Sequence, residues 1–253
     1  MLVVAVLLFF TVVYAATTGS IQMTFGEFMT GLFDPNNEKM AVIKDLRFPR
    51  IFVAIFAGAA LSVAGVLLQA IMRNPLADAG IIGISSGAAF TKLFIVSLFP
   101  MYFFYAPIAA FIGGAIACAL VFGLSWKSGL NPLKLILVGI AINAMFAGMI
   151  EALISFGVSN AGATTSNLSL KTWDDVTIIA TYGTIGLVIA FALFAWCNVL
   201  VLSDKTAKSI GFNVTTARIV IAAVAVLLSS VSVVVAGVIS FVGILVPHMA
   251  RRI

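Results

Sequence analysis

The chain has 253 residues, of which 62% are hydrophobic and only 9% are charged, and its formal net charge is +5. Soluble domains carry about 25% charged residues, so this composition excludes an ordinary water-soluble fold. It predicts an all-α protein that crosses a membrane several times, since helices satisfy every backbone group internally. The basic residues are sparse and lie between apolar runs, which argues against nucleic acid as a partner.

Eight apolar segments are candidate helices, because crossing the hydrocarbon core takes about 20 mostly apolar residues. They cover residues 1–17, 51–72, 81–99, 102–126, 133–154, 176–202, 217–236 and 239–250, and the last is too short to span unaided. The first could also be a signal peptide, but it lacks a basic start and further spans follow. The polar stretch before residue 176 is rich in Gly, Ser, Thr and Asn, which suits a structured loop or a short re-entrant piece.

The lysines and arginines between these segments predict the orientation of the chain. Eight lie on one side, namely Arg73, Lys127, Lys134, Lys205, Lys208, Arg218, Arg251 and Arg252. The other side has Lys171 and four residues of the long loop 18–50: Lys39, Lys44, Arg47 and Arg50. Because long loops count little in the positive-inside rule, the first side is expected in the cytoplasm, together with the N-terminus.

Two apolar stretches resemble each other. "AGVLLQAIMRNP" begins at Ala64 and "AGVISFVGILVP" at Ala236, and both run from Ala-Gly-Val to a proline. The first lies on a segment heading inward and the second begins at the end of one heading outward. An inverted-topology repeat would leave this pattern, although apolar segments also match by chance.

The connection "RNPLADAGIIGISSGAAF", which starts at Arg73, is more specific than a plain turn between helices requires. Pro75 is expected to end the preceding helix, because proline lacks an N–H and disfavours helix at the residue before it. Gly80, Gly83 and Gly87 permit tight turns and close backbone approach. Composition alone favours a simple helix–turn–helix connection.

The pattern itself favours a function. "NPLADAGIIGISSGA" closely resembles the signature of FecCD-type permeases, the membrane subunits of ABC importers for iron–siderophores, haem and cobalamin. Further resemblances follow in order along nearly the whole chain: "DLRFPRIFVAIFAGAALSVAGVLLQ", "LILVGIAINA", "SDKTAKSIGFNV" and "VAGVISFVGILVPHMAR". The resemblance implies a helical bundle of the type II ABC importer class in the bacterial cytoplasmic membrane. It also implies three kinds of protein partner: two ATP-binding subunits, an external substrate-binding protein and a second permease copy.

The segment 203–214 is predicted to form a short amphipathic helix on the cytoplasmic side. Ser203 or Asp204 can cap its start and Gly211 can end it, while Ala207, Ile210 and Phe212 form a small apolar stripe. The alternative is a solvated loop helix. The resemblance implies a coupling segment that meets the ATP-binding subunit, through Asp204, Lys205, Ala207, Lys208, Ile210 and Gly211. No G-x-x-x-x-G-K-[ST] motif occurs, so ATP would be used by another polypeptide.

The resemblance also implies roles at both ends of the transport path. Arg47 and Arg50, in "RFPR", match arginines that contact acidic residues of the substrate-binding protein, a pairing for which guanidinium groups are well suited. The alternative is interfacial anchoring. Asn74 and Leu76 match positions that narrow the cytoplasmic end of the path. A companion constriction is expected at Asn131, Pro132 and Leu133, where Pro-Leu departs from the small hydroxyl residues of some relatives.

The remaining chemistry-bearing side chains are few. Lys92 and Glu151 are ionisable residues inside predicted helices, where charges are costly and are functional candidates; they could pair, line the path or snorkel. His248 is the only histidine and makes a poor metal site by itself, so a structural role is expected. Cys118 and Cys197 lie in apolar runs and are expected to pack there. No metal or cofactor is expected.

The whole chain, residues 1–253, is interpreted as one transmembrane permease domain. Family members are longer, so two C-terminal helices are expected to be missing here. The leading hypothesis is a non-enzymatic permease subunit that takes up iron chelates, either haem or ferric siderophores. The alternatives are a cobalamin importer permease and a secondary transporter driven by an ion gradient, which would need carboxylates near the middle of the membrane. A membrane enzyme is disfavoured because no nucleophile–base pair or metal cluster is evident.

Overall fold

The computed structural model describes residues 2–19, 23–31, 33–34, 37–125, 132–158 and 168–252. Within these ranges every regular element is a helix, which confirms the all-α prediction. The elements are α1 (Leu2–Thr17), α2 (Phe25–Gly31), α3 (Glu38–Val42), the π-helix η1 (Ile43–Arg47), α4 (Phe48–Met72), α5 (Ile84–Leu98), the 3-10 helix η2 (Pro100–Tyr105), α6 (Ala106–Ser125), α7 (Pro132–Ser155), α8 (Trp173–Ala192), α9 (Phe194–Leu200), α10 (Asp204–Ser209), α11 (Val214–Ala236) and α12 (Val242–Ala250).

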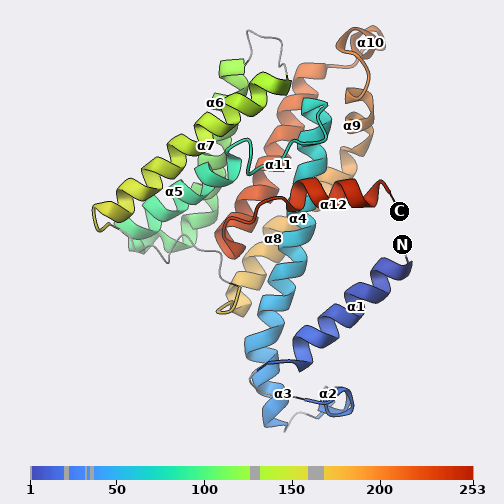
Figure 1. Ribbon diagram of the computed structural model, residues 1–253, viewed down its shortest axis with the longest axis vertical. Helices are drawn as coiled ribbons and strands as arrows, with labels where there is room; N and C mark the ends of the chain where they lie inside the picture. The colour runs from blue at the N-terminus through green and yellow to red at the C-terminus, as the bar shows by residue number, and fades with distance from the viewer. Residues whose placement is uncertain are drawn as a thin grey trace.

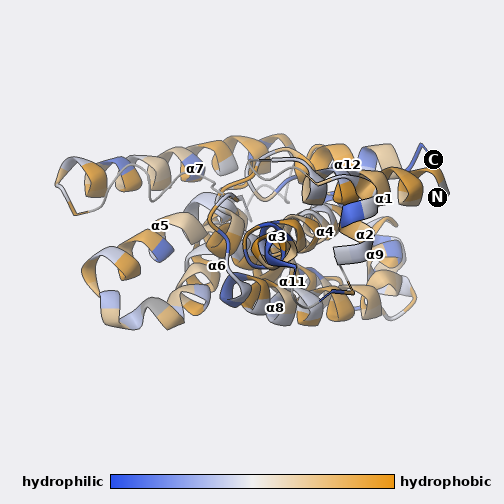
Figure 2. Ribbon diagram, turned by 90° about the horizontal axis from the view of Figure 1, so that it is seen from below, coloured by the Kyte–Doolittle hydropathy of each residue, from blue (hydrophilic) through white to orange (hydrophobic). Residues whose placement is uncertain are grey.

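Helices α4 and α11 lie in the middle of the bundle, with α7 and α8 along opposite edges (Figure 2). The central position of α4 follows from its small residues, because Ala57, Ala60, Ala64 and Gly65 are all buried and let neighbouring backbones approach closely. The ribbon has mostly the colour of hydrophobic residues, on the outer helices as well as in the middle (Figure 2), and many large apolar side chains are exposed. A bundle that is apolar outside as well as inside is suited to lipid and not to water.

Five of the described helices are long and apolar enough to cross a membrane: Glu38–Met72, Ala106–Ser125, Leu133–Ser155, Trp173–Ala192 and Val214–Ala236. Helices α1 and α5 are shorter apolar helices, and α12 has only nine residues, as its sequence predicted. Figure 1 shows α12 lying across α4 and not alongside it. The chain is therefore a membrane protein with several spans.

Two expectations about the helices were wrong. The expected long loop 18–50 contains α2, α3 and η1, and one continuous helical run extends from Glu38 to Met72. Its polar start is helical because the Asn37 side chain caps it, accepting a hydrogen bond from Met40 N at 3.1 Å. The expected helix 176–202 is interrupted at Leu193, whose backbone leaves the helical region (φ −89°, ψ 2°).

Two non-helical segments meet inside the bundle. The first, residues 73–83, follows α4, and the second, residues 237–241, separates α11 from α12. Asp78 of the first segment is buried, and its carboxylate accepts hydrogen bonds from the backbone N–H groups of Gly80, Ala79 and Phe241. The signature stretch therefore packs into the bundle, whereas its composition alone favoured a simple helix–turn–helix connection.

The crossing of α4 and α12 holds this meeting point together. A methyl group on Gly65 would lie 2.5 Å from Gly243 Cα and closer still to its carbonyl oxygen, so only glycine allows this approach. Gln69 donates from Nε2 to Gly243 O at 3.0 Å and accepts from Arg251 at 2.7 Å. As expected from the sequence, the first of the two resembling stretches begins inside a helix and the second at the end of one: Ala64 lies inside α4 and Ala236 is the last residue of α11.

Candidate functional site

The end of α4 is tied to α10 and α11 by three charged side chains. Arg73 closes α4 in the left-handed conformation (φ 48°) and donates from Nε to Leu200 O at 2.7 Å and from its Nη2 to Leu202 O. The same nitrogen pairs with Asp204 at 2.6 Å, and Arg218 of α11 binds both oxygens of that carboxylate, at 3.0 and 3.2 Å. Arg73, Asp204 and Arg218 are called the clasp below.

Electrostatics keep the clasp charged. Partial burial raises the pKa of Asp204, but the hydrogen bond from Arg73 and the positive charges of Arg218 and Arg73 outweigh it and leave the pKa below its ordinary value of 3.8. The Asp204 side chain is 41% exposed, so water weakens each ion pair individually. The geometry is nevertheless specific, because one carboxylate joins three segments of the chain.

Helix α10 projects from one end of the bundle (Figure 1). Ser203 caps it by accepting from Thr206 N at 3.1 Å, and Gly211 follows its end with φ 79°, so both sequence-predicted boundaries are confirmed. The expected apolar stripe does not face one way: two of its side chains point into the protein and one points outward. Ala207 is fully buried and Phe212 packs edge-on against Trp196 at 6.0 Å, whereas Ile210 is 62% exposed.

The outward surface of α10 therefore carries one exposed apolar side chain, Ile210, beside the exposed Lys205 and Lys208. Of the residues expected to meet a partner, these three and Gly211 are exposed, whereas Ala207 is buried. Ala207 and Gly211 set the shape of the helix, and Asp204 belongs to the clasp.

The expected gate residues lie at the ends of α4 and α7. Asn74 accepts a hydrogen bond from Leu76 N at 3.0 Å, which forms a tight turn, and Leu76 is 58% exposed. Pro132 is the first residue of α7 and Leu133 is exposed, while Asn131 lies outside the described residues. The segment after this turn packs on α7, where a methyl group at Gly139 would lie 2.9 Å from Ile81 O.

A cavity of about 520 Å³ adjoins both the clasp and Asn74. One side is formed by the end of α4 and the turn after it, and the other by α9 and by Arg251. Its lining residues are Val66, Gln69, Ala70, Arg73, Asn74, Pro75, Cys197, Asn198, Val201 and Arg251. This volume lies within the roughly 300–1,000 Å³ typical of ligand pockets, and several lining side chains are polar.

The two arginines near the start of α4 have different surroundings. Arg47 is 7% exposed and donates from Nη1 to Ala16 O at 2.7 Å, fastening the end of α1 to the π-helix. Arg50 is half-buried one turn later. Of the expected docking pair, Arg50 is thus the more accessible side chain.

The two ionisable residues within the helices are not a pair. Lys92 of α5 donates from Nζ to Val234 O at 2.8 Å, whereas Glu151 is exposed on α7. Val234 lies in the last turn of α11, where carbonyl groups lack helical partners and a positive charge is stabilising. Lys92 therefore caps the end of α11 just before the non-helical segment 237–241.

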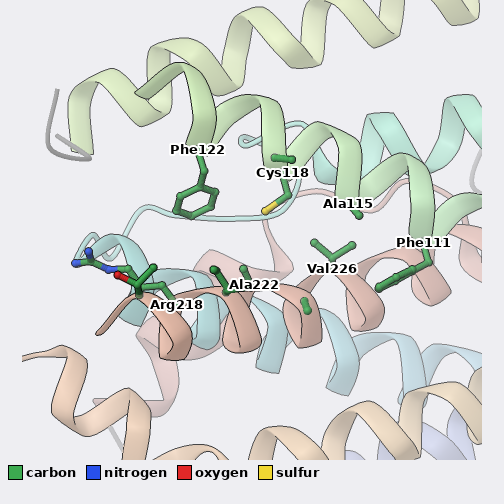
Figure 3. Close-up of a pocket in the computed structure, with 11 residues that line it drawn as sticks. Phe111, Ala115, Cys118, Phe122, Arg218, Ala222 and Val226 are labelled. Carbon is green, nitrogen blue, oxygen red and sulfur yellow. The ribbon is translucent and has the colours of Figure 1, made fainter. Parts of the chain in front are cut away.

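Two apolar hollows lie beside α11. The first, of about 280 Å³, is enclosed by α6 and α11, and Figure 3 shows Phe111, Cys118 and Phe122 facing Ala222 and Val226 across it. Arg218 stands at its end with the guanidinium turned away from it (Figure 3). Cys118 is buried in this apolar setting, in agreement with its expected packing role. A second hollow of about 550 Å³ continues toward α8.

Among the residues that the structure describes, no three His, Cys, Asp or Glu side chains gather as potential metal ligands. His248 is exposed on α12 next to the buried Pro247.

The sequence analysis did not predict the structural roles of Arg73 and Arg218, because it used both residues only to orient the chain in the membrane. Their sequence signal is weak, because the partner carboxylate lies 131 and 14 residues away.

The family assignment comes from comparison with known proteins. The family model described as "FecCD transport family" matches residues 6–253. The chain belongs to the FecCD transport family. Two curated relatives carry the name "Probable heme-iron transport system permease protein IsdF", from Staphylococcus aureus strains MSSA476 and MW2, and each is 38% identical over 248 residues. Those matches cover 98% of this chain and 76% of each relative.

A solved structure agrees with this FecCD assignment. The structure described as "an inward-facing conformation of a putative metal-chelate type ABC transporter" matches with a TM-score of 0.82 and 26% sequence identity, covering 98% of this chain and 79% of that chain. The chain is therefore an ABC transporter permease by family and by fold. ATP-binding and substrate-binding subunits are the partners that this family implies.

Proposed function

We propose that this FecCD permease carries an iron chelate across the bacterial cell membrane, with haem as the first substrate to test and ferric siderophores as the second. The 38% identity to a heme-iron permease supports haem, because it extends over 98% of the chain. ATP hydrolysed by two copies of a separate subunit drives the cycle, and the permease itself catalyses no reaction.

The α10 end of the molecule is the cytoplasmic side in this proposal, and the N-terminus lies on that side too. The observation that carries the proposal is the surface at α10: a short capped helix carries the exposed Lys205 and Lys208 and is followed directly by the exposed Ile210. An exposed apolar side chain with flanking charges suits a groove on a soluble subunit. The opposite end carries Arg50 and receives the substrate-binding protein.

A second permease copy is proposed to pack on α7. This helix lies at the edge of the bundle and exposes Leu133, Leu137 and Ile140. Their spacing of four and three residues keeps these apolar side chains on one face of the helix. The path for the chelate would then run between the two copies, with Asn74, Leu76, Pro132 and Leu133 toward its cytoplasmic end.

The proposal is tested by the variant Ile210→Glu. A carboxylate at this exposed position leaves the permease fold unchanged but disrupts an apolar contact with the ATP-binding subunit, so co-purification of that subunit should be lost. Leu170→Glu is the matched control, because Leu170 is 80% exposed at the other end of the molecule. Full retention of the ATP-binding subunit by Ile210→Glu would refute docking at α10.

Uptake experiments test the substrate and the energy source of transport separately. ATP-dependent uptake of haem into vesicles that contain the permease and its ATP-binding subunit supports the proposal. Uptake of cobalamin in place of haem would identify a cobalamin importer. Uptake driven by a sodium or proton gradient without the ATP-binding subunit would identify a secondary transporter.

A further inference from the structure

The clasp joins distant parts of the chain through several polar contacts. Arg73 makes three contacts at once, to Leu200 O, Leu202 O and Asp204, all in the connection that leads into α10. Arg218 grips the same carboxylate through two nitrogens. Asp204 is the first residue of α10, so a displacement of that helix moves the carboxylate directly.

Arg73 is also the last residue before the turn that bears Asn74 and Leu76. Its backbone has φ 48°, a left-handed conformation that is unfavourable for a residue with a Cβ atom. The backbone N–H of Arg73 bonds to Gln69 O, and the N–H of Asn74 bonds to the same oxygen at 3.2 Å. The position of this strained turn therefore depends on where the Arg73 side chain is held.

The space around the turn allows it to move. The cavity of about 520 Å³ separates Asn74 and Pro75 from Cys197, Asn198 and Val201 of the α9 region. On the side of the cavity, the turn is not held by close packing. The Arg73 side chain reaches from the end of α4 to Leu200 O, at the end of α9. A movement of α10 thus has a direct polar route to the turn.

We propose that Arg73 and Asp204 transmit movement of α10 to the turn at Asn74 and Leu76, with Arg218 fixing the carboxylate to α11. The proposal rests on the proposed function, in which an ATP-binding subunit moves α10. It assigns Arg73, Asp204 and Arg218 as positioning residues that contact neither ATP nor the chelate. Their loss separates ATP hydrolysis from transport while leaving the docking surface in place.

The test uses the permease reconstituted into vesicles with its ATP-binding subunit and substrate-binding protein, with haem as the probe. Three quantities are measured: retention of the ATP-binding subunit, ATP hydrolysis, and haem taken up per ATP hydrolysed. Asp204→Asn removes the charge with little change of shape, and Arg73→Gln removes the other partner. Asp174→Asn is the matched control, because Asp174 is an exposed carboxylate in the first turn of α8, outside the clasp.

Both clasp variants should retain the subunit and hydrolyse ATP, while haem uptake per ATP falls about tenfold, which is within the range of coupling between sites in proteins. The double variant Arg73→Gln/Asp204→Asn should be no worse than either single variant, because residues that act as one unit are non-additive. Arg73→Lys should be intermediate, since an ammonium cannot make the same divergent contacts. Asp174→Asn should behave as wild type.

Two results would overturn the proposal. In the first, Asp204→Asn transports haem with unchanged uptake per ATP. In the second, Asp204→Asn loses the ATP-binding subunit, which would make the clasp part of the docking surface only. A failure of the proposed function looks different, because the wild-type permease itself would then retain no ATP-binding subunit and show no ATP-dependent uptake.

Discussion

The crossing of α4 and α12 gives a sharp prediction for the variant Gly65→Ala. The added methyl group would lie 2.5 Å from Gly243 Cα, whereas a relaxed carbon–carbon contact is about 3.5 Å, so the helices must separate by roughly 1 Å. The hydrogen bond from Gln69 to Gly243 O, now 3.0 Å, would lengthen beyond the normal range. Backbone atoms form the obstacle, so no side-chain rotation relieves it.

The magnitude follows from these two losses. Overpacking costs about 1–3 kcal/mol, and a lost buried hydrogen bond about 0.5–1.5 kcal/mol, giving roughly 2–4 kcal/mol in all. For a chain of this size, each kcal/mol lowers the melting temperature by about 2–4 °C. Thermal unfolding of the purified protein in detergent, followed by the fluorescence of its three tryptophans, should show a decrease of roughly 4–16 °C.

Gly58→Ala is the matched control on the same helix. A methyl group there meets no atom within 4 Å, and replacing glycine by alanine within a helix is stabilising by about 0.5–1 kcal/mol. The two variants should therefore shift the melting temperature in opposite directions. Equal stability of Gly65→Ala and wild type would show that the two backbones do not approach as closely as the structure indicates.

Three further predictions concern single contacts. Lys92→Met leaves Val234 O without its donor and should lower the free energy of unfolding by about 1–3 kcal/mol, whereas unchanged thermal stability would exclude a capping role. Gly211→Ala places a Cβ at φ 79°, which should cost about 1–2 kcal/mol in the same assay; no loss would mean that this turn is not left-handed. The lowered pKa of Asp204 predicts a stabilisation that is complete above its ordinary pKa of 3.8 and disappears as the pH falls through the lower folded value. Acid unfolding of Asp204→Asn should lack that component, and an identical acid profile for wild type and variant would contradict it.

Periodic and local features of the fold could be predicted from sequence. Apolar segment lengths placed the main helices within a few residues, since a hydrophobic run of sufficient length has few alternatives in a bilayer. The boundaries of α10 followed from Ser203 and Gly211, because capping and a left-handed end are properties of single residues and their immediate neighbours. The family resemblance rested on short ordered motifs of the same local kind.

Contacts between distant segments could not be predicted in this way. The pairing of Arg73 with Asp204 and the approach of Gly65 to Gly243 depend on how whole helices are placed. The burial of Arg47 against Ala16 O also required the position of α1, which the sequence left open. The interruption at Leu193 could not be predicted, because no proline or glycine occurs there. It lies between α8 and α9, where α9 contacts α4 and α11.

The most direct measurement is haem uptake into sealed vesicles that contain the permease, its ATP-binding subunit and the substrate-binding protein. Uptake that requires ATP and disappears with Ile210→Glu is the expected result. Uptake that continues without ATP, or that follows an imposed sodium or proton gradient, would contradict the account of an ATP-driven importer that receives its force through α10.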